Sequence, residues 1–351
     1  MNIINKLWYP NKDNSTIEKI FLKLLYSVLL PFSFIYFVFT VIRIALYKHK
    51  LIKSYKCRIP VIVIGNIVSG GSGKTPVVIS LALALKHKKL NVGIISRGYK
   101  AKIINPIIIN NNHNANQVGD EPLLIFQKTH LPICVHSNRV LAIETLLNTY
   151  QDLDVIISDD GLQHLKMQRD IECVVFNNFE TGNNTLLPSG PLRENIRKWD
   201  YSLYSGDNIS NKIIHNSQSK AVKSKRVNKN LYNMKSNEIK SISDFKNQNI
   251  LIAAGIAHPQ NIKKLFDEFN INANIYFNLN DHQELTNKHI LEINKNYHEY
   301  NIIIITEKDL VKYNKNSLIH TLNKEVWVLN LEALIPNDFI QDIFIKIQKN
   351  K

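Results

Sequence analysis

Residues 61–75 constrain the fold more than any other part of the chain. They read VIVIGNIVSGGSGKT, a short apolar run followed by a glycine-rich turn, and Pro76 and a helical pattern come next. This order predicts a strand, a phosphate loop and a helix. Glycines let successive backbone N–H groups point into one concavity, and the helix N-terminus adds a positive dipole end. The stretch is therefore expected to bind nucleotide phosphates.

The loop departs from the usual spacing, G-x-x-x-x-G-K-[ST], in which a glycine stands where this chain has Val68. Gly70 and Gly71 are expected to provide the flexibility instead. Lys74 is expected to reach the β- and γ-phosphates, and the Thr75 hydroxyl to hold Mg²⁺. The predicted nucleotide contacts are Val68, Ser69, Gly70, Gly71, Ser72, Gly73, Lys74 and Thr75.

Apolar runs alternate with helical patterns along most of the chain, which indicates an α/β protein with a doubly wound parallel sheet. The sequence predicts a P-loop NTPase-like core and a second, smaller α/β domain. The expected division is an N-terminal helix with a basic flank at 1–50, a kinase core at 51–204, a connector at 205–248 and a C-terminal domain at 249–351. Polar motifs follow the strands, where ligands bind in such sheets.

Residues 24–42 form an apolar stretch of 19 residues without a charge. As a helix it would be about 28 Å long, close to the thickness of a hydrocarbon core. Basic residues follow it, which favours a cytoplasmic C-terminal end. The alternative is a buried helix of a soluble protein. The sequence predicts membrane attachment and leaves open whether the helix spans the bilayer or enters one leaflet.

The net charge of +15 suits anionic lipid, phosphorylated substrates or nucleic acid. No nucleic-acid-binding module is recognisable, and charge alone does not account for residues 24–42, so no nucleic-acid partner is expected. Cys57, Cys134 and Cys173 are scattered, which indicates reduced thiols and not a zinc site.

Carboxylates and arginines near the strand ends are the candidates for chemistry. Asp159 and Asp160 end an apolar strand, and one of them is expected to hold Mg²⁺. Asp120 is either a helix cap or the carboxylate that deprotonates an attacking hydroxyl. The candidate cations are Arg97, Arg139 and Arg193.

A membrane-bound NTPase that switches partners is the alternative function. The Thr306-Glu307-Lys308-Asp309 stretch resembles the guanine-reading [NT]-K-x-D motif, but the lysine is one position late. Ser69 also stands where partitioning and targeting ATPases carry a lysine. Both departures count against a switch protein.

Taken together, these motifs resemble the tetraacyldisaccharide 4'-kinase family, the membrane-associated lipid A kinases. The resemblance covers nearly the whole chain, and the order and number of the motifs make it specific. The motifs are GNIVSGGSGKTP, SRGY (96–99), GDEP (119–122), DDGLQH (159–164), LPSGPLRE (187–194), AGIAHPQ (254–260), DH (281–282) and TEKD (306–309). His258 and Gln283 depart from the family pattern, and His258 is given no role.

The resemblance implies transfer of the γ-phosphate of ATP to the 4'-hydroxyl of a tetraacyldisaccharide 1-phosphate, with ATP and Mg²⁺ as cofactors. It implies that Asp120 and His282 form the catalytic pair and that Thr75, Asp159 and Glu121 handle Mg²⁺. The residues implied to contact the lipid headgroup are Arg97, Tyr99, Asp160, Gln163, His164, Arg193 and Glu194.

The expected partners are the glycolipid and an anionic membrane surface, with no obligate protein partner. The expected location is the inner (cytoplasmic) membrane, with the catalytic domains on the cytoplasmic face.

Overall fold

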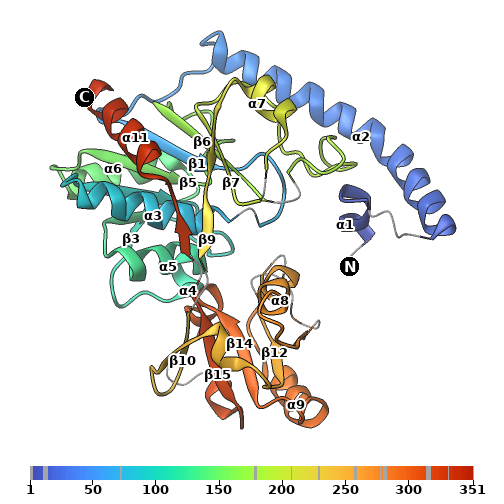
Figure 1. Cartoon of the computed structure of the whole chain (residues 1–351). Helices are drawn as coiled ribbons and strands as arrows, with labels where there is room; N and C mark the ends of the chain where they lie inside the picture. The colour runs from blue at the N-terminus through green and yellow to red at the C-terminus, as the bar shows by residue number, and fades with distance from the viewer. Residues whose placement is uncertain are drawn as a thin grey trace. The chain divides into compact units, whose positions relative to one another are not determined.

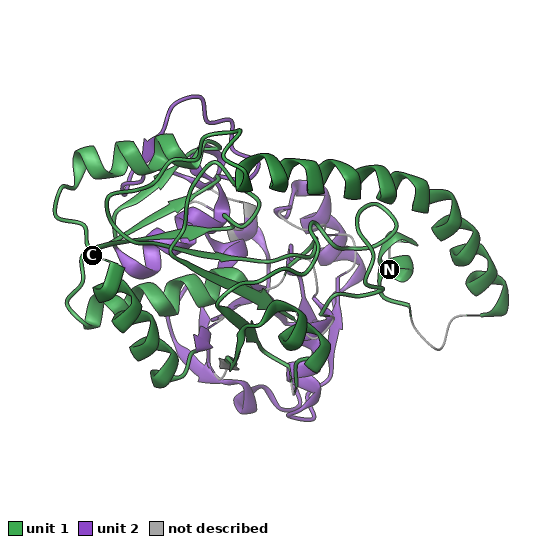
Figure 2. Cartoon of the chain, turned by 90° about the horizontal axis from the view of Figure 1, so that it is seen from above, with its two compact units in different colours: residues 1–97, 131–225, 335–351 green, residues 98–130, 226–334 purple. Residues whose placement is uncertain are grey.

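This computed structural model describes residues 3–10, 15–71, 73–177, 180–206, 208–227, 230–256, 259–276, 279, 283–313, 318–330 and 332–350. The chain forms two compact units (Figure 2). Unit 1 comprises residues 1–97, 131–225 and 335–351, and unit 2 comprises residues 98–130 and 226–334. Both units are discontinuous, whereas the predicted division used consecutive ranges, and that division stays a prediction.

Unit 1 contains a parallel sheet in which β1 lies between β5 and β6 (Figure 1). Seven of its strands follow the order β4-β2-β5-β1-β6-β7-β8, and every pairing among them is parallel. The predicted doubly wound α/β architecture is confirmed. The strands are β1 (Val61–Gly65), β2 (Val92–Ser96), β4 (Ile133–Val135), β5 (Val155–Asp159), β6 (Ile171–Phe176), β7 (Tyr201–Tyr204) and β8 (Lys220–Lys223).

The central strands of unit 1 are buried along their whole length, since every residue of β1, β2, β5 and β6 is buried. This explains why they read as continuous apolar runs and not as alternating patterns. The helices of unit 1 are α1 (Ile3–Trp8), α2 (Thr16–Lys48), α3 (Lys74–His87), α6 (Arg139–Thr149), α7 (Asn211–Ser217) and α11 (Asn337–Asn350).

Helix α2 contains the predicted apolar stretch and extends beyond it at both ends. Ser15 caps its N-terminus by accepting a hydrogen bond from the backbone N–H of Glu18. By length and composition, α2 is long and apolar enough to cross a membrane. Most of its large apolar side chains are exposed, among them Phe34 and Phe39 at 65% and 64%.

Unit 2 contains a mixed sheet of six strands in the order β11-β10-β15-β14-β12-β13. Strands β13, β12, β14 and β15 are parallel, and β10 and β11 are antiparallel additions. The strands of this unit are β3 (Ile107–Ile108), β10 (Asn230–Asn233), β11 (Ile239–Ser241), β12 (Ile250–Ile252), β13 (Ala273–Ile275), β14 (Ile302–Thr306), β15 (Glu325–Leu329) and β16 (Glu332–Leu334).

Alternate residues of β14 enter two separate cores, which is why four consecutive isoleucines suit this strand. Ile302 and Ile304 belong to the core that α8 covers, and Ile303 and Ile305 belong to the core that α9 covers. The helices of unit 2 are α4 (Ala115–Val118), α5 (Asp120–Thr129), α8 (Gln260–Asp267), α9 (Asn287–Asn296) and α10 (Glu307–Leu310), with 3-10 turns at Ile242–Phe245 and Leu318–Thr321.

The stretch 205–248, expected to be a connector, contains α7 and strands β8 to β11. Leu231 and Phe245 from this stretch lie in the core of unit 2. Strand β9 (Lys225–Val227), at the boundary of the two units, pairs with β16. These strands have three or four residues each and are rich in lysine and asparagine, so they leave little periodic signal in the sequence.

Candidate active site

The phosphate loop connects β1 to α3 in unit 1. Gly70 and Gly73 have φ values of 105° and 83°, and Gly73 caps α3. These left-handed conformations are open to glycine at little cost. Val68, at the position where the usual motif has glycine, forms an antiparallel bridge with Leu192 and is buried. The loop therefore needs glycine at 70 and 73, and position 68 takes an ordinary extended residue.

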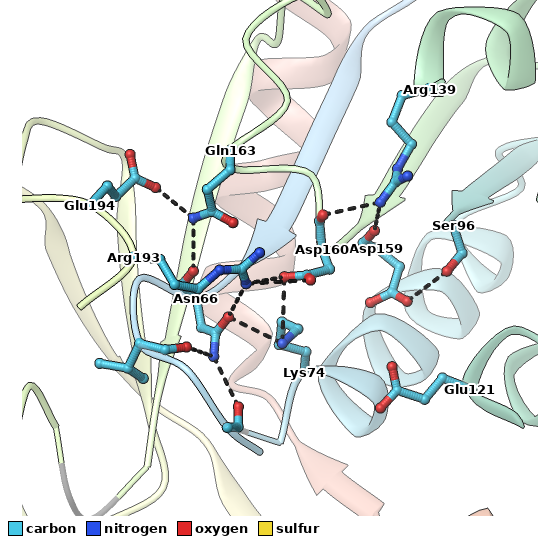
Figure 3. A network of polar contacts seen from close by, with 12 residues as sticks. Asn66, Lys74, Ser96, Glu121, Arg139, Asp159, Asp160, Gln163, Arg193 and Glu194 are labelled. Carbon is cyan, nitrogen blue, oxygen red and sulfur yellow. Dashed lines mark hydrogen bonds and ion pairs between the residues drawn. The ribbon is translucent and has the colours of Figure 1, made fainter. Parts of the chain in front are cut away.

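Asn66, the first residue after β1, organises the loop from within (Figure 3). Its side chain is 1% exposed, and its amide donates to the carbonyls of Val68 at 2.7 Å and Gly70 at 3.3 Å. Its Oδ1 accepts hydrogen bonds from Lys74 at 3.2 Å and from Arg193 at 3.1 Å. Asn66 was not among the predicted site residues, although an asparagine directly after a buried strand in the loop motif is a usable signal.

Asp160, directly after β5, forms ion pairs with two cationic side chains (Figure 3). Its carboxylate lies 3.5 Å from Lys74 Nζ and 3.2 Å from Arg193 Nη1. Burial acts to raise the pKa of Asp160, but Lys74 and Arg193 outweigh it, and the pKa lies below its ordinary value. The residue has a φ of 51°, a conformation that costs free energy in a non-glycine residue. The fold thus holds this carboxylate between the loop lysine and Arg193.

Asp159 lies beside the phosphate loop because β5 and β1 pair in register, with Asp159 opposite Ile64. It is 1% exposed, and its Oδ2 accepts a hydrogen bond from Ser96 at 3.0 Å. Ser96, at the end of β2, was not among the predicted site residues. Its partner lies 63 positions away in the sequence, so only the pairing of strands brings the two together.

Arg139 has a structural part in the site that the sequence did not specify. It is 3% exposed and donates to the backbone carbonyls of His136 at 3.1 Å and Asp160 at 3.2 Å. Burial lowers its pKa to about 10, although Asp159 and Asp160 act against this change. Arg139 therefore fixes the turn that carries the two aspartates.

Gln163 and Glu194 contact each other, and Gln163 also contacts Asn66. Gln163 Nε2 donates to Glu194 Oε1 at 2.8 Å and to the carbonyl of Asn66 at 3.1 Å. Glu194 also accepts from Arg197 Nε at 3.2 Å. The structure thus brings the predicted residues Lys74, Arg193 and Gln163 together around Asn66. Asp160 joins this group through Lys74 and Arg193, and Glu194 joins it through Gln163. Arg97 is exposed at the end of β2.

His164 lies in a cationic environment. Burial is the main cause that lowers its pKa to about 4, and Arg139 and Arg169 add to the effect. Its buried Nε2 has no hydrogen-bond partner among the described residues. The ring is accordingly neutral near pH 7.

The stability of the protein should depend on His164 in acid. An unfolded chain has the ordinary His pKa of about 6.5. The unfolded state therefore takes up this proton first as the pH falls, and the contribution of neutral His164 is lost between about pH 6.5 and 4. We expect the difference in melting temperature between wild type and His164→Gln to be constant above pH 7 and to shrink toward pH 4. A difference that does not change with pH would contradict this; His298→Gln, at a side chain 81% exposed, is the control.

Asp120 and Glu121 begin α5 in unit 2. Gly119, not Asp120, is the N-cap; its φ is 93°, and an added Cβ would lie 3.2 Å from Gly98 Cα. Asp120 is 7% exposed, and its Oδ1 accepts from the N–H of Glu121 at 2.9 Å. Asp120 is therefore the first residue of the helix and not its N-cap. Tyr99, in the same unit, is 53% exposed.

The TEKD stretch of unit 2 binds the α5 helix. Lys308 Nζ lies 2.9 Å from Glu121 Oε1, and Glu307 forms an ion pair with Lys128. Asp309 Oδ1 accepts from the N–H of Gly255 at 3.0 Å and pairs with Lys312. Instead of reading a guanine base, this stretch holds the helix that carries Asp120.

Two other predicted residues, Ser72 and His282, lie outside the described residues.

Within the described part of the chain, no three His, Cys, Asp or Glu side chains gather into a metal site. Mg²⁺ in kinases is held by one or two carboxylates, with phosphates and water as the other ligands. A buried carboxylate beside a phosphate loop, as Asp159 is, fits that donor set.

Comparisons with known proteins agree over nearly the full chain. The family model described as tetraacyldisaccharide-1-P 4'-kinase matches residues 25–348. A tetraacyldisaccharide 4'-kinase of Wigglesworthia glossinidia brevipalpis is 40% identical over 317 residues, with 89% of this chain and 80% of the relative covered. That of Herminiimonas arsenicoxydans is 35% identical over 335 residues, with 92% and 91% covered.

Among solved structures, LpxK from Aquifex aeolicus in complex with ATP is similar with a TM-score of 0.70. It is 25% identical in sequence, and the match covers 92% of this chain and 99% of that one.

Proposed function

Because the chain belongs to the tetraacyldisaccharide 4'-kinase family, we infer that it phosphorylates the 4'-hydroxyl of a tetraacyldisaccharide 1-phosphate at the expense of ATP. The protein is an ATP-dependent phosphotransferase of lipid A biosynthesis. The observation that carries this function is the family match over residues 25–348, which includes the phosphate loop and every strand of the parallel sheet of unit 1. No comparison supports the partner-switch alternative.

In the reaction, the 4'-oxygen attacks the γ-phosphorus of ATP and forms the new P–O bond. The bond from the γ-phosphorus to the β,γ-bridging oxygen breaks, and ADP leaves with that electron pair. The hydroxyl proton passes to a base. Positioning and charge stabilisation dominate such transfers, so the protein needs one base and several cations. Lys74 and Arg193 provide positive charge at the carboxyl end of the unit 1 sheet.

We propose Asp120 as that base and His282 as the group that orients the hydroxyl or tunes the reacting pair. The proposal for Asp120 is supported by its burial and by its place in the first turn of α5, held through Glu121 and Lys308. A carboxylate that is nearly enclosed and anchored on a helix can be positioned toward a single proton.

For the cofactor, Thr75, Asp159 and Glu121 would hold Mg²⁺, which when bound neutralises charge on the phosphates. For the glycolipid headgroup we propose Arg97, Tyr99, Asp160, Gln163, His164, Arg193 and Glu194. Two observations favour this set: Gln163 Oε1 and His164 Nε2 are buried and have no hydrogen-bond partner within the described residues. Polar atoms left in this state are costly unless an ordered water molecule or a ligand satisfies them.

Release of ADP tests the function against a switch NTPase. We expect the purified protein with ATP and Mg²⁺ in detergent micelles to release ADP slowly until the tetraacyldisaccharide 1-phosphate is added. A coupled ADP assay measures this. Rapid release without the lipid, unchanged by its addition, would favour the switch.

The protein is membrane-associated, as lipid A kinases of this family are. We propose that it lies on the cytoplasmic face of the inner membrane, with α2 in contact with the bilayer and the basic residues after α2 against anionic lipid. The exposed apolar side chains of α2 support this placement, and each nearby Lys or Arg contributes about 1 kcal/mol. An acyl-chain substrate stays in the bilayer, so its kinase must reach it there.

The attachment can be tested without cutting α2. Phe34 and Phe39 are 65% and 64% exposed, so replacing both with Asn removes mainly exposed apolar surface and, within the protein, the ring contact of Phe34 with Phe37 on the same helix. We expect the amount that sediments with anionic vesicles to fall at least about tenfold. Ile104→Asn, at a residue 88% exposed in unit 2, is the control. Undiminished sedimentation of the double variant would place the membrane contact elsewhere.

A further inference from the structure

A narrow stripe of α2 faces the protein, although most of the large apolar side chains of the helix are exposed. The buried residues of α2 are Leu22, Ser33 and Thr40. Their spacings of 11 and 7 residues are close to whole turns of a helix with 3.6 residues per turn, so they share one side. Two of the three are polar, and Ser33 is at the middle of the apolar stretch. A polar stripe within a lipid-binding helix calls for a partner inside the protein.

The partner of Ser33 is the segment of residues 186–193, which we name the clamp segment. Ser33 is 5% exposed, and its Oγ donates to the carbonyl of Leu186 at 2.9 Å. It accepts from the backbone N–H of Ser189 at 3.0 Å and lies 2.6 Å from Ser189 Oγ. With Ser189 Oγ as the donor of the third bond, the hydroxyl of Ser33 uses its one donor and both acceptor positions.

Two more N-terminal side chains bind the clamp segment. Tyr36, one turn after Ser33, donates its hydroxyl to the carbonyl of Arg193 at 2.8 Å. Trp8 Nε1 donates to the carbonyl of Pro188 at 3.0 Å. The N-terminal helices thus contact the clamp segment at its start, middle and end.

The same segment also pairs with the phosphate loop. The N–H of Ser69 donates to the carbonyl of Pro191 at 2.8 Å, and the N–H of Arg193 donates to the carbonyl of Ile67 at 2.7 Å. Between them, Leu192 bridges Val68. The clamp segment therefore adds a short strand-like edge to the loop that holds the phosphates.

Arg193 joins the two sets of contacts. Its carbonyl accepts from Tyr36, its N–H donates to the phosphate loop, and its guanidinium contacts Asp160 and Asn66. A continuous chain of hydrogen bonds, all within unit 1, runs from the middle of α2 to the residues around Lys74. Such contacts can transmit position because each bond is directional.

We propose that Ser33 and Tyr36 are positioning residues for the nucleotide site: through the clamp segment, the membrane helix holds the phosphate loop in its ATP-binding conformation. This rests on the proposed function only in that α2 is taken to be the membrane helix and the loop to bind ATP. The helix accordingly has two separate faces, an apolar face for lipid and a polar stripe for the nucleotide site.

The test is a double variant, Ser33→Ala with Tyr36→Phe, in the full chain in detergent micelles. Each change removes only a hydroxyl group. The matched control is Ser27→Ala with Tyr26→Phe on the same helix, where Ser27 bonds only the carbonyl of Lys23 within α2. The dissociation constant of ATP, the KM for ATP, sedimentation with vesicles and the melting temperature are measured for both variants.

We expect the Ser33/Tyr36 variant to bind ATP about three- to tenfold more weakly, with vesicle sedimentation unchanged. Amide hydrogen exchange should rise at Ser69 and Arg193, whose N–H groups join the loop and the clamp segment. The control should keep wild-type ATP affinity. A lower melting temperature with unchanged ATP affinity would overturn the proposal and leave these hydroxyls with a stability role alone.

Failure of the proposed membrane attachment would be seen separately. The Phe34/Phe39 variant loses vesicle binding if α2 is the anchor and should keep its affinity for ATP. If that variant still sediments but the Ser33/Tyr36 variant binds ATP weakly, the anchor assignment is wrong and the positioning role stands. Equal loss of ATP affinity in both variants and in the control would contradict two separate faces.

Discussion

Asp120→Asn should lower kcat about 10³-fold while the dissociation constant of ATP changes little. A general base contributes about 10² to 10⁴ to the rate, and an amide of the same shape cannot accept the proton. Asp120 is in unit 2, whereas the phosphate loop is in unit 1, so the substitution leaves the loop intact. The measurement is single-turnover phosphate transfer together with titration of ATP.

The control for Asp120→Asn is Asp338→Asn. Asp338 is also in the first turn of a helix, α11, but it is exposed. This control should keep wild-type turnover. If Asp120→Asn did the same, Asp120 would be a residue of the α5 terminus and the base would have to be found elsewhere.

Lys74→Ala should weaken ATP binding by about two to three orders of magnitude and abolish measurable transfer. Lys74 is the cation that the loop presents to the phosphates, and its Nζ already contacts Asn66 and Asp160. The substitution also removes the ion pair between Lys74 and Asp160 and leaves Asp160 paired with Arg193. Breaking a partly buried ion pair is costly. Titration of ATP by calorimetry measures the loss.

Lys86→Ala, at the exposed far end of α3, is the control for this charge removal. Lys74→Arg keeps the charge but has a planar fork in place of a compact ammonium, and it should restore only part of the affinity. ATP affinity within a factor of about three of wild type in Lys74→Ala would contradict the assignment of the loop.

The phosphate loop and the parallel sheet could be predicted from the sequence because their signals are local. A β-branched run, glycines and Gly73-Lys74-Thr75 follow one another within 15 residues. The strands of unit 1 are apolar throughout because both faces are covered, and this pattern is visible in any single segment.

The discontinuous units could not be predicted, because they depend on contacts between distant segments. Helix α5 follows strands of unit 1 in the sequence, yet its ion pair with Lys308, 187 positions away, ties it to unit 2. Likewise, α11 comes after the last strand of unit 2 but belongs to unit 1. No local pattern distinguishes a helix that stays with its preceding strand from one that does not.

Asn66 and Ser33 could not be predicted for the same reason, because their roles depend on contacts with distant segments. Asn66 is recognised by its bond to Arg193, 127 positions away, and Ser33 by its bonds to Leu186 and Ser189. Taken alone, Asn66 is a loop asparagine and Ser33 a small polar residue in an apolar helix. Their roles come from the clamp segment, which passes between α2 and the phosphate loop.

The most direct test of the central claim is the position of the transferred phosphate. The purified protein is incubated with ATP labelled at the γ-phosphate, Mg²⁺ and tetraacyldisaccharide 1-phosphate in detergent micelles, and the lipid product is examined by mass spectrometry and ³¹P NMR. We expect one labelled phosphate per disaccharide, attached at the 4'-oxygen. Unmodified lipid, or label at any other position, would contradict the account.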